Sequence, residues 1–317
     1  MKLLKDLVVV CLMLLTASFS QASDDGGHPE KPSEWKQDSY QHLRKMVGLT
    51  RFQNKSSLLD DRLVSAIDDT LAAVLTEKCP ENIPVRNDHP IFLELRNRQP
   101  RRVSGEIDNM TLIRTGRAAG LNAVVAGEIM DIRHFQEEMG YWWFKNMISF
   151  FEVHLHCSVY DTETGAKLLD MTVSEKTDLP EELYRQVESG DYAGAFPEIQ
   201  RISVSLAEKI GEEICTKMEE ELFKSFVREI DGRQVVVSSG SNTGIRPGDL
   251  LAIHDSGRVI IGKDEHQFFI AGLKTGILRI DTVADDSAEG SIVQGEMAGK
   301  DVCLKPIVEP SWFSGFF

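Results

Sequence analysis

Residues 120–176, GLNAVVAGEIMDIRHFQEEMGYWWFKNMISFFEVHLHCSVYDTETGAKLLDMTVSEK, decide the fold. They predict a small-residue helix end, a buried strand, an aromatic-rich connection, an alternating strand, a tight Asp-Thr-Glu-Thr-Gly turn and a third strand. The second strand has the two-residue period of a half-buried strand. Its apolar members are Phe151, Val153, Leu155 and Cys157, and its polar members are Glu152, His154, His156 and Ser158. The stretch therefore predicts an antiparallel meander, and it contains no recognisable catalytic motif.

Further elements flank this meander. Upstream, a strand over residues 45–52 precedes a helix over residues 57–78, where apolar residues recur at helical spacing. A short strand near residues 83–85 follows, and then a short helix that Asp108 caps and Gly120 closes. Downstream, the chain is acidic and loop-like after Pro180 until a long amphipathic helix begins near Pro197. We expect residues 40–225 to form one α/β domain.

The composition changes near Phe226, where short β-rich runs alternate with glycine-containing turns about every 8 to 12 residues. Five or so short strands over residues 226–307 favour a small closed, SH3-like barrel, because closure removes exposed strand edges. The fold class predicted for the whole chain is therefore α+β. It combines the α/β domain and its meander with a small all-β barrel.

The first residues indicate export. Lys2 and Lys5 precede an apolar run over residues 7–15, and small residues including Ser20 and Ala22 follow, which is typical of a signal peptide spanning residues 1–22. A retained anchor is the alternative, but the run is short for a bilayer, which needs about 20 apolar residues. Residues 23–39 are expected to be a flexible leader. We predict a periplasmic protein that is either free or associated with the outer membrane.

The formal net charge of -15 argues against nucleic acid as a partner, because phosphates require clustered Lys and Arg. Four cysteines remain outside the signal peptide, namely Cys79, Cys157, Cys215 and Cys303. An oxidising compartment permits disulfides, and four cysteines allow three pairings, among which the sequence does not choose. The alternative is four reduced, buried thiols that act as small hydrophobic side chains.

Aromatic residues crowd the connection between the first two strands, where a loop is ordinarily polar. They are Tyr141, Trp142, Trp143, Phe144, Phe150 and Phe151. The segment either folds back into the core, packs against a neighbouring subunit or contacts a membrane. Our functional hypothesis is the second, since a ring-forming protein needs an apolar patch that meets a different patch on its neighbour. A second candidate contact is the tail over residues 308–317, with Trp312, Phe313, Phe316 and Phe317.

Other motifs do not support a catalytic, metal or cofactor site. Glu152, His154 and His156 alternate on one strand face and could grip a metal, but the solvated face of any antiparallel strand shows the same pattern. Asp161 and Gly165 suit a hairpin turn better than a calcium loop. The segment SGSNTGIRPGD lacks the ending of a phosphate loop, so its glycines Gly240, Gly244 and Gly248 are expected to serve turns. We expect no enzyme activity and no cofactor.

The order of the short motifs resembles two known families. LNAVVAGEI, VYDTETG and LLDMTVSEK, preceded by GLTRFQNKS, resemble the domain shared by the curli secretion protein CsgG, the LpoB-type lipoproteins and the N-terminal domain of TolB, over residues 40–223. SGSNTGIRPGDLLAI, GILRI, SAEGSIV and GKDVCLK resemble the C-terminal barrel of the FlgT family of flagellar-assembly proteins. In that family a G-(I/V)-x-x-G-D turn precedes a strand. The matching residues here are Gly244, Ile245, Arg246, Pro247, Gly248 and Asp249.

These resemblances imply a non-enzymatic periplasmic assembly or scaffold protein, with a flagellar basal-body ring as its first candidate setting. They also imply protein partners in the cell envelope, a homo-oligomer or ring, and proximity to the outer membrane or peptidoglycan. One alternative is an envelope secretion component related to curli export. Another is a periplasmic ligand-binding protein or hydrolase with an unrecognised site.

Overall fold

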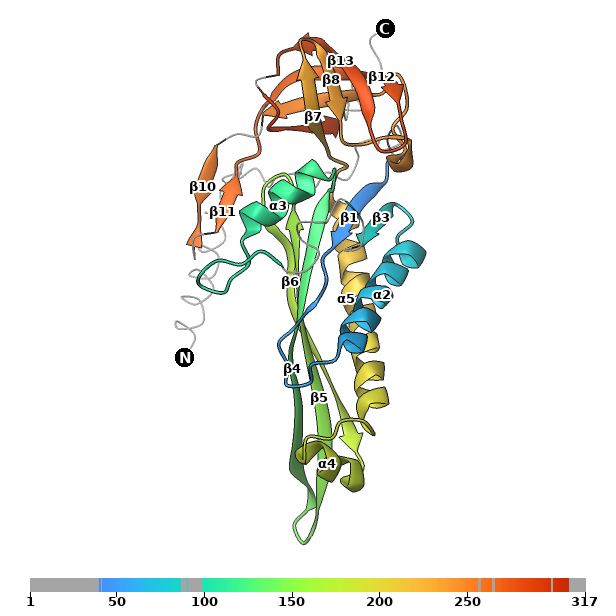
Figure 1. The fold of residues 1–317 in the computed structure, drawn as a ribbon, viewed down its shortest axis with the longest axis vertical. Helices are drawn as coiled ribbons and strands as arrows, with labels where there is room; N and C mark the ends of the chain where they lie inside the picture. The colour runs from blue at the N-terminus through green and yellow to red at the C-terminus, as the bar shows by residue number, and fades with distance from the viewer. Residues whose placement is uncertain are drawn as a thin grey trace, which may run out of the picture. The chain divides into compact units, whose positions relative to one another are not determined.

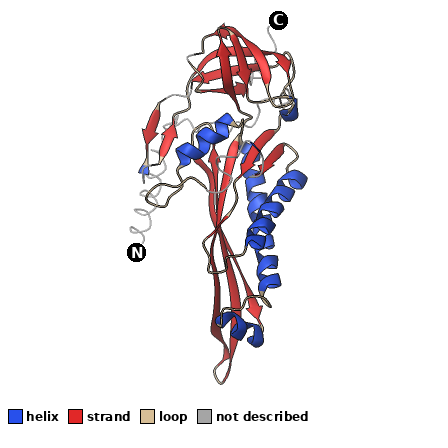
Figure 2. Ribbon diagram, in the orientation of Figure 1, coloured by secondary structure: helices blue, strands red, loops and turns tan. Residues whose placement is uncertain are grey.

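The computed structural model describes residues 40, 42–86, 90, 99–255, 258–263, 266–297 and 299–307. All of them belong to one compact unit, Gln37–Val308. The predicted signal peptide, the predicted leader and the aromatic tail, with Trp312, Phe313, Phe316 and Phe317, lie outside the described residues. The described chain is mixed α+β, and it contains a sheet with helices and a closed barrel (Figures 1 and 2).

The sheet contains the predicted antiparallel meander. Its strands are β1 (Lys45–Leu49), β2 (Gln53–Asn54), β3 (Asn82–Arg86), β4 (Ala123–Tyr141), β5 (Phe144–Asp161) and β6 (Lys167–Leu179). They lie in the order β3-β1-β4-β5-β6, with β2 beside β4. β1 runs parallel to β3 and β4, whereas β4, β5 and β6 are antiparallel neighbours. The three strands of the meander, β4, β5 and β6, are thus the longest strands of the sheet.

Four helices accompany the sheet in the described residues: α2 (Asp61–Lys78), α3 (Asn109–Ala118), α4 (Glu181–Glu188) and α5 (Phe196–Glu220). Asp60 begins α2 by accepting a hydrogen bond from the Arg62 amide, and Asp108 begins α3 by accepting one from the Thr111 amide. The capping residue that the sequence predicts for α3 is therefore confirmed.

Helix α4 corrects the prediction of a loop between Pro180 and Pro197. Pro180 precedes its first turn, and Glu181 and Glu182 lie in that turn, where the helix dipole favours acidic side chains. Val187 is fully buried, and Leu183 and Tyr184 are partly buried against the same core cluster, so the helix has a short apolar face. The sequence indicates a loop here because the helix is only eight residues long and mostly polar, so its apolar face is too short to show a clear period.

The core follows the alternation of β5. Phe151, Val153, Leu155 and Cys157 are all fully buried, and they pack in one cluster with residues of α2 and α5. Figure 1 shows these two helices side by side along the sheet. They approach closely because Gly211 of α5 has no side chain, and a Cβ there would lie 2.7 Å from Val74. The predicted buried face is confirmed.

The second part of the fold is a closed six-stranded barrel, one strand more than the sequence suggested. Its members are β7 (Ser225–Asp231), β8 (Gln234–Val237), β9 (Leu250–Asp255), β12 (Lys274–Val283), β13 (Ala288–Gly295) and β14 (Val302–Pro306). A separate hairpin of β10 (Val259–Ile261) and β11 (Gln267–Phe269) leaves the barrel between β9 and β12. The domain boundary at residues 225 and 226 and the SH3-like assignment stay predictions.

Glycines of the segment SGSNTGIRPGD serve turns, as the sequence indicates. A short 3₁₀ turn, η3 (Ser241–Thr243), ends at Gly244, which has a φ of 90°. Gly248 has a φ of 94°, and Gly240 lies so close to the Ala284 carbonyl that a Cβ would be 2.4 Å away. Positive φ and close backbone approach both favour glycine.

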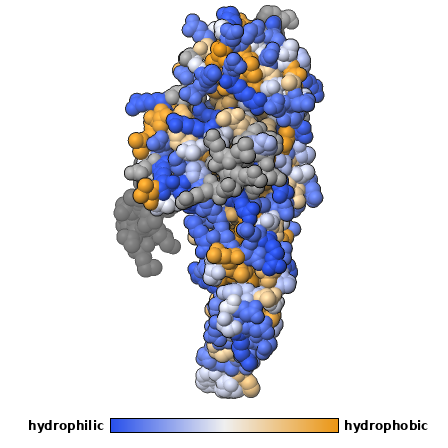
Figure 3. Space-filling view, viewed as in Figure 1, coloured by the Kyte–Doolittle hydropathy of each residue, from blue (hydrophilic) through white to orange (hydrophobic). Residues whose placement is uncertain are grey.

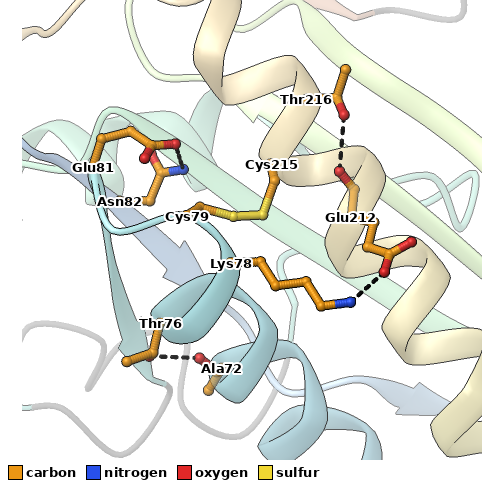
Figure 4. The surroundings of a disulfide bond; sticks show 9 residues. All are labelled: Ala72, Thr76, Lys78, Cys79, Glu81, Asn82, Glu212, Cys215 and Thr216. Atoms are coloured by element: carbon orange, nitrogen blue, oxygen red, sulfur yellow. Dashed lines mark hydrogen bonds and ion pairs between the residues drawn. A yellow bond between two sulfur atoms is a disulfide. The ribbon is translucent and has the colours of Figure 1, made fainter.

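A disulfide between Cys79 and Cys215 joins the end of α2 to α5 (Figure 4). The two Cα atoms are 5.8 Å apart, within the usual range for a disulfide, and the bridge spans 136 residues of sequence. Cys157 and Cys303 are buried free thiols. Burial raises the pKa of Cys157 to about 12, which keeps its thiol protonated. The structure thus has one bridge and two free thiols, so it matches neither two bridges nor four reduced cysteines, the alternatives that the sequence leaves open.

Thiol titration of the denatured, unreduced chain without residues 1–22 should find the thiols of Cys157 and Cys303 only. Four thiols would contradict the bridge.

The double variant Cys79→Ser/Cys215→Ser should lower the free energy of unfolding by about 3–5 kcal/mol, because it releases a long loop in the unfolded chain. Denaturant unfolding measures this loss, and Cys157→Ser is the control without a bridge.

Candidate functional site: an aromatic hairpin apex

The predicted aromatic connection is the apex of a long β-hairpin. β4 and β5 stay paired up to Tyr141 and Phe144, and only Trp142 and Trp143 form the turn. These four aromatic side chains are 91%, 74%, 81% and 73% exposed, respectively. Figure 3 shows pale and tan residues where the hairpin ends, at the bottom of the view. We call residues 141–144 the aromatic apex. The described chain does not fold it back into the core.

The backbone of this turn is unusual for its sequence. Across the described parts of the chain, Trp142 is the only residue other than glycine with a clearly positive φ, at 51°. A two-residue hairpin loop with positive φ at its first central position ordinarily has glycine there. A bulky side chain in that region costs about 1–2 kcal/mol. The hairpin thus retains a tryptophan where glycine would be more stable.

Two of the six aromatic residues that the sequence groups in this connection do not belong to the aromatic apex. Phe151 is fully buried against α2 and α5. Phe150 is 4% exposed, because the Phe135 ring lies 5.7 Å from its ring and the Lys176 ammonium lies 3.8 Å from its centre. Both side chains are covered by the chain itself. This corrects their inclusion in a partner surface and leaves the aromatic apex as the described candidate.

The charged groups next to the apex are paired. Lys145 Nζ lies 2.7 Å from Glu138 Oε2, across the hairpin from β5 to β4. Lys176 Nζ of β6 lies 2.7 Å from Glu137 Oε2. Each lysine thus faces a glutamate, so neither of these two lysines is an uncompensated positive charge beside the apex.

The histidines that could have formed a metal site do not converge. His154 Nε2 lies 3.0 Å from Glu152 Oε2, whereas His156 Nε2 lies 2.9 Å from Asp170 Oδ1. Each imidazole faces its own carboxylate, so the two rings do not share one site. Within the described ranges, no three His, Cys, Asp or Glu side chains are arranged to hold a metal ion.

The opposite end of β5 is a polar junction that the sequence did not reveal. The Asp161 carboxylate accepts hydrogen bonds from the Glu163 and Thr164 amides and so forms the predicted turn, which Gly165 completes at a φ of 78°. The same carboxylate lies 2.6 Å from Lys224 Nζ. Lys224 also contacts Glu221, at the end of α5, and precedes the first barrel strand, β7.

Both members of the Asp161–Lys224 pair are buried, with side chains 6% and 5% exposed. Burial alone would raise the pKa of Asp161, but the charge of Lys224 and hydrogen bonds from Lys224 and Thr164 outweigh it and hold that pKa below its usual value. Burial alone would lower the pKa of Lys224, but the charges of Asp161 and Glu221 raise it overall. The pair is ionised across the neutral range.

More contacts join this turn to the barrel side of the fold. Lys305 Nζ of β14 lies 2.7 Å from Glu163 Oε1. Arg117 of α3 donates a hydrogen bond to the Thr162 carbonyl, and its guanidinium lies 4.0 Å from the centre of the Phe269 ring. The signal that could have found Lys224 is its place in the apolar run around Phe223 and Phe226, where a lysine needs a buried partner.

No protein family model and no curated protein matches the chain. Solved structures with some similarity include a lipoprotein from Neisseria meningitidis, at 15% identity and a TM-score of 0.27 over 46% of this chain and 94% of that chain. The PelC dodecamer from Paraburkholderia phytofirmans has 12% identity and a TM-score of 0.28 over 53% of this chain and 86% of that chain.

TolB from Acinetobacter baumannii has 11% identity and a TM-score of 0.25, and the match covers 82% of this chain and 59% of that chain. TM-scores this low support no assignment of family, partner or assembly, so the resemblances to the CsgG and FlgT families stay predictions. Within the described residues, no helix has the length and apolarity needed to span a membrane.

The buried pair predicts a specific pattern of stability. Lys224→Met should lower the free energy of unfolding by about 3–5 kcal/mol at neutral pH, because it leaves the Asp161 carboxylate buried without its cation. In the double variant Asp161→Asn/Lys224→Met, the free energy of unfolding should fall by clearly less. Denaturant unfolding at pH 7 measures both changes. Equal losses in the single and double variants would contradict the coupling.

The pH dependence follows from Asp161. Its pKa in the folded protein lies below the unfolded value of about 3.9, so its contribution is complete above that value and is lost as the pH falls through the folded pKa. The difference in stability between wild type and Asp161→Asn/Lys224→Met should therefore shrink below about pH 4. An unchanged difference at low pH would contradict this assignment.

Proposed function

We propose that the protein is a non-enzymatic assembly or scaffold protein of the periplasm, and that the aromatic apex is the contact by which it joins an envelope assembly. The observation that carries the proposal is the strained turn that displays two exposed tryptophans. Exposed aromatic groups of this kind mark interaction sites rather than ordinary surface. Backbone strain of this kind is characteristic of functional sites.

The apex has the properties of a binding element. Trp and Tyr supply large contact areas and dominate the energetics of many interfaces. The Trp142 and Trp143 rings lie 4.9 Å apart, so they present one continuous apolar surface. The β4–β5 ladder continues up to the turn, and its paired backbone limits the entropy that is lost when a partner binds.

A flagellar basal-body ring is the setting that we propose first, and an envelope secretion complex is the alternative. What supports the flagellar setting is the resemblance of residues 239–305 to the FlgT-type barrel, together with the closed barrel in that part of the chain. In either setting the mechanism is recognition: the body of the protein holds the hairpin, and the apex makes the contact.

The variant Trp142→Gly/Trp143→Ser tests the proposal, because Gly-Ser is a favoured sequence for such a turn. We expect the variant to leave the envelope fraction and appear as free protein in the periplasmic fraction. Its free energy of unfolding should stay the same or rise by about 1 kcal/mol, since glycine relieves the strain at residue 142. Cell fractionation and denaturant unfolding measure the two effects.

The matched control is Leu59→Ser/Val103→Ser, which removes two other highly exposed apolar side chains, 81% and 110% exposed. We expect this control to stay with the envelope. If the apex variant stays in the envelope fraction as wild type does, the apex is not the attachment point. Release of both variants alike would also count against it, because the effect would then be one of general surface hydrophobicity.

A further inference from the structure

We propose that the aromatic apex inserts shallowly into the interface of a phospholipid membrane, without crossing it. The inference rests on the proposed function, because it names the partner of the same apex. It commits to lipid as the partner, and a protein pocket becomes an outcome of the test.

Apolar side chains lie on both faces of the hairpin end, and this favours lipid. Residues paired across an antiparallel ladder share a face, so Tyr141, Phe144 and Met139 lie on one face. Met147 lies on the other face, opposite Glu138 and behind Lys145, so it marks the depth to which that face can be inserted. Met139 and Met147 are 47% and 55% exposed. A flat protein surface would cover only one of these faces, whereas lipid surrounds an inserted ribbon. Tryptophan and tyrosine are also the residues enriched at the boundary between headgroups and acyl chains.

The nearest charges limit the depth of insertion. Lys145 lies one residue behind the Tyr141–Phe144 pair, and Glu138 lies three residues behind it. At about 3.3 Å per residue, these charges are roughly 3–10 Å from that pair. Interfacial elements are buried by about 5–10 Å, and a lysine stem reaches back to the headgroups. A crossing strand needs about 9–11 residues, which the charges at residues 137 and 138 interrupt.

The charge balance at the hairpin end predicts which lipid surface is bound. Lys145 is paired with Glu138 and Lys176 with Glu137, so the apex has no net positive charge for anionic lipid. The whole chain carries a formal net charge of -15, which anionic headgroups repel. Binding should therefore be strongest on zwitterionic vesicles, and added salt should not weaken it.

The test uses the chain without residues 1–22 and vesicles of phosphatidylcholine, with some lipids brominated on the acyl chain near the headgroup. Wild type should sediment with the vesicles, and brominated lipid should quench its tryptophan fluorescence. Trp142→Gly/Trp143→Ser should lower the partition coefficient by roughly 100-fold or more, because two large aromatic surfaces no longer leave water. This variant retains Trp35 and Trp312, so any quenching that it still shows would place a lipid contact outside the apex and contradict the inference.

Each other outcome overturns the inference. Equal vesicle binding by wild type and the apex variant would place the lipid contact elsewhere. If wild type does not bind vesicles but the apex variant is still released from the envelope fraction, then the partner is a protein. In that case the proposed function is supported and the lipid inference is wrong. If vesicle binding and apex-dependent envelope association are both missing, the proposed function fails as well. The control Leu59→Ser/Val103→Ser should bind vesicles as wild type does.

Discussion

β4 and β5 pair from Ala123 and Asp161 at one end to Tyr141 and Phe144 at the other. The positions of the polar junction at Asp161 and of the aromatic apex both depend on this register. A slip of one residue would turn the buried side chains of β5 toward water, so the apolar period holds the pairing in place. The same register places the polar turn against the barrel side and the aromatic residues at the far end. One ladder therefore links the core, the junction and the apex.

The two ends of this ladder solve different physical problems. At the junction, a carboxylate and an ammonium are buried together, and their mutual attraction with added hydrogen bonds offsets the loss of water. At the apex, the aromatic side chains remain in water and the backbone is strained at Trp142. The first arrangement stabilises the unit itself. The second is unfavourable in the free protein, which is why we assign the binding function to the apex.

The sequence alone predicts the local features of this structure best. The alternation of β5 gave its buried face, and Asp108 gave the start of α3, because each depends on neighbours in the chain. Lys224 was missed because its partner Asp161 lies 63 residues away. The pairing of Cys79 with Cys215 was undetermined for the same reason, since it depends on how α2 packs on α5.

The apex itself was only half predicted. The aromatic cluster identified the segment, but tryptophans argue against a tight turn, so the extension of both strands up to Tyr141 and Phe144 was not foreseen. Phe150 and Phe151 were grouped with the apex by their proximity in sequence, although neighbouring strand residues point to opposite faces. Their burial follows once the register is known.

Photo-cross-linking in cells tests the central claim most directly. A photoreactive phenylalanine analogue at position 143 should give adducts with an envelope component, and the same analogue at position 59, which is also highly exposed, should give none. Mass spectrometry of the adducts would distinguish lipid from protein. The absence of adducts at position 143, or equal labelling at both positions, would contradict the claim that the aromatic apex is the attachment point.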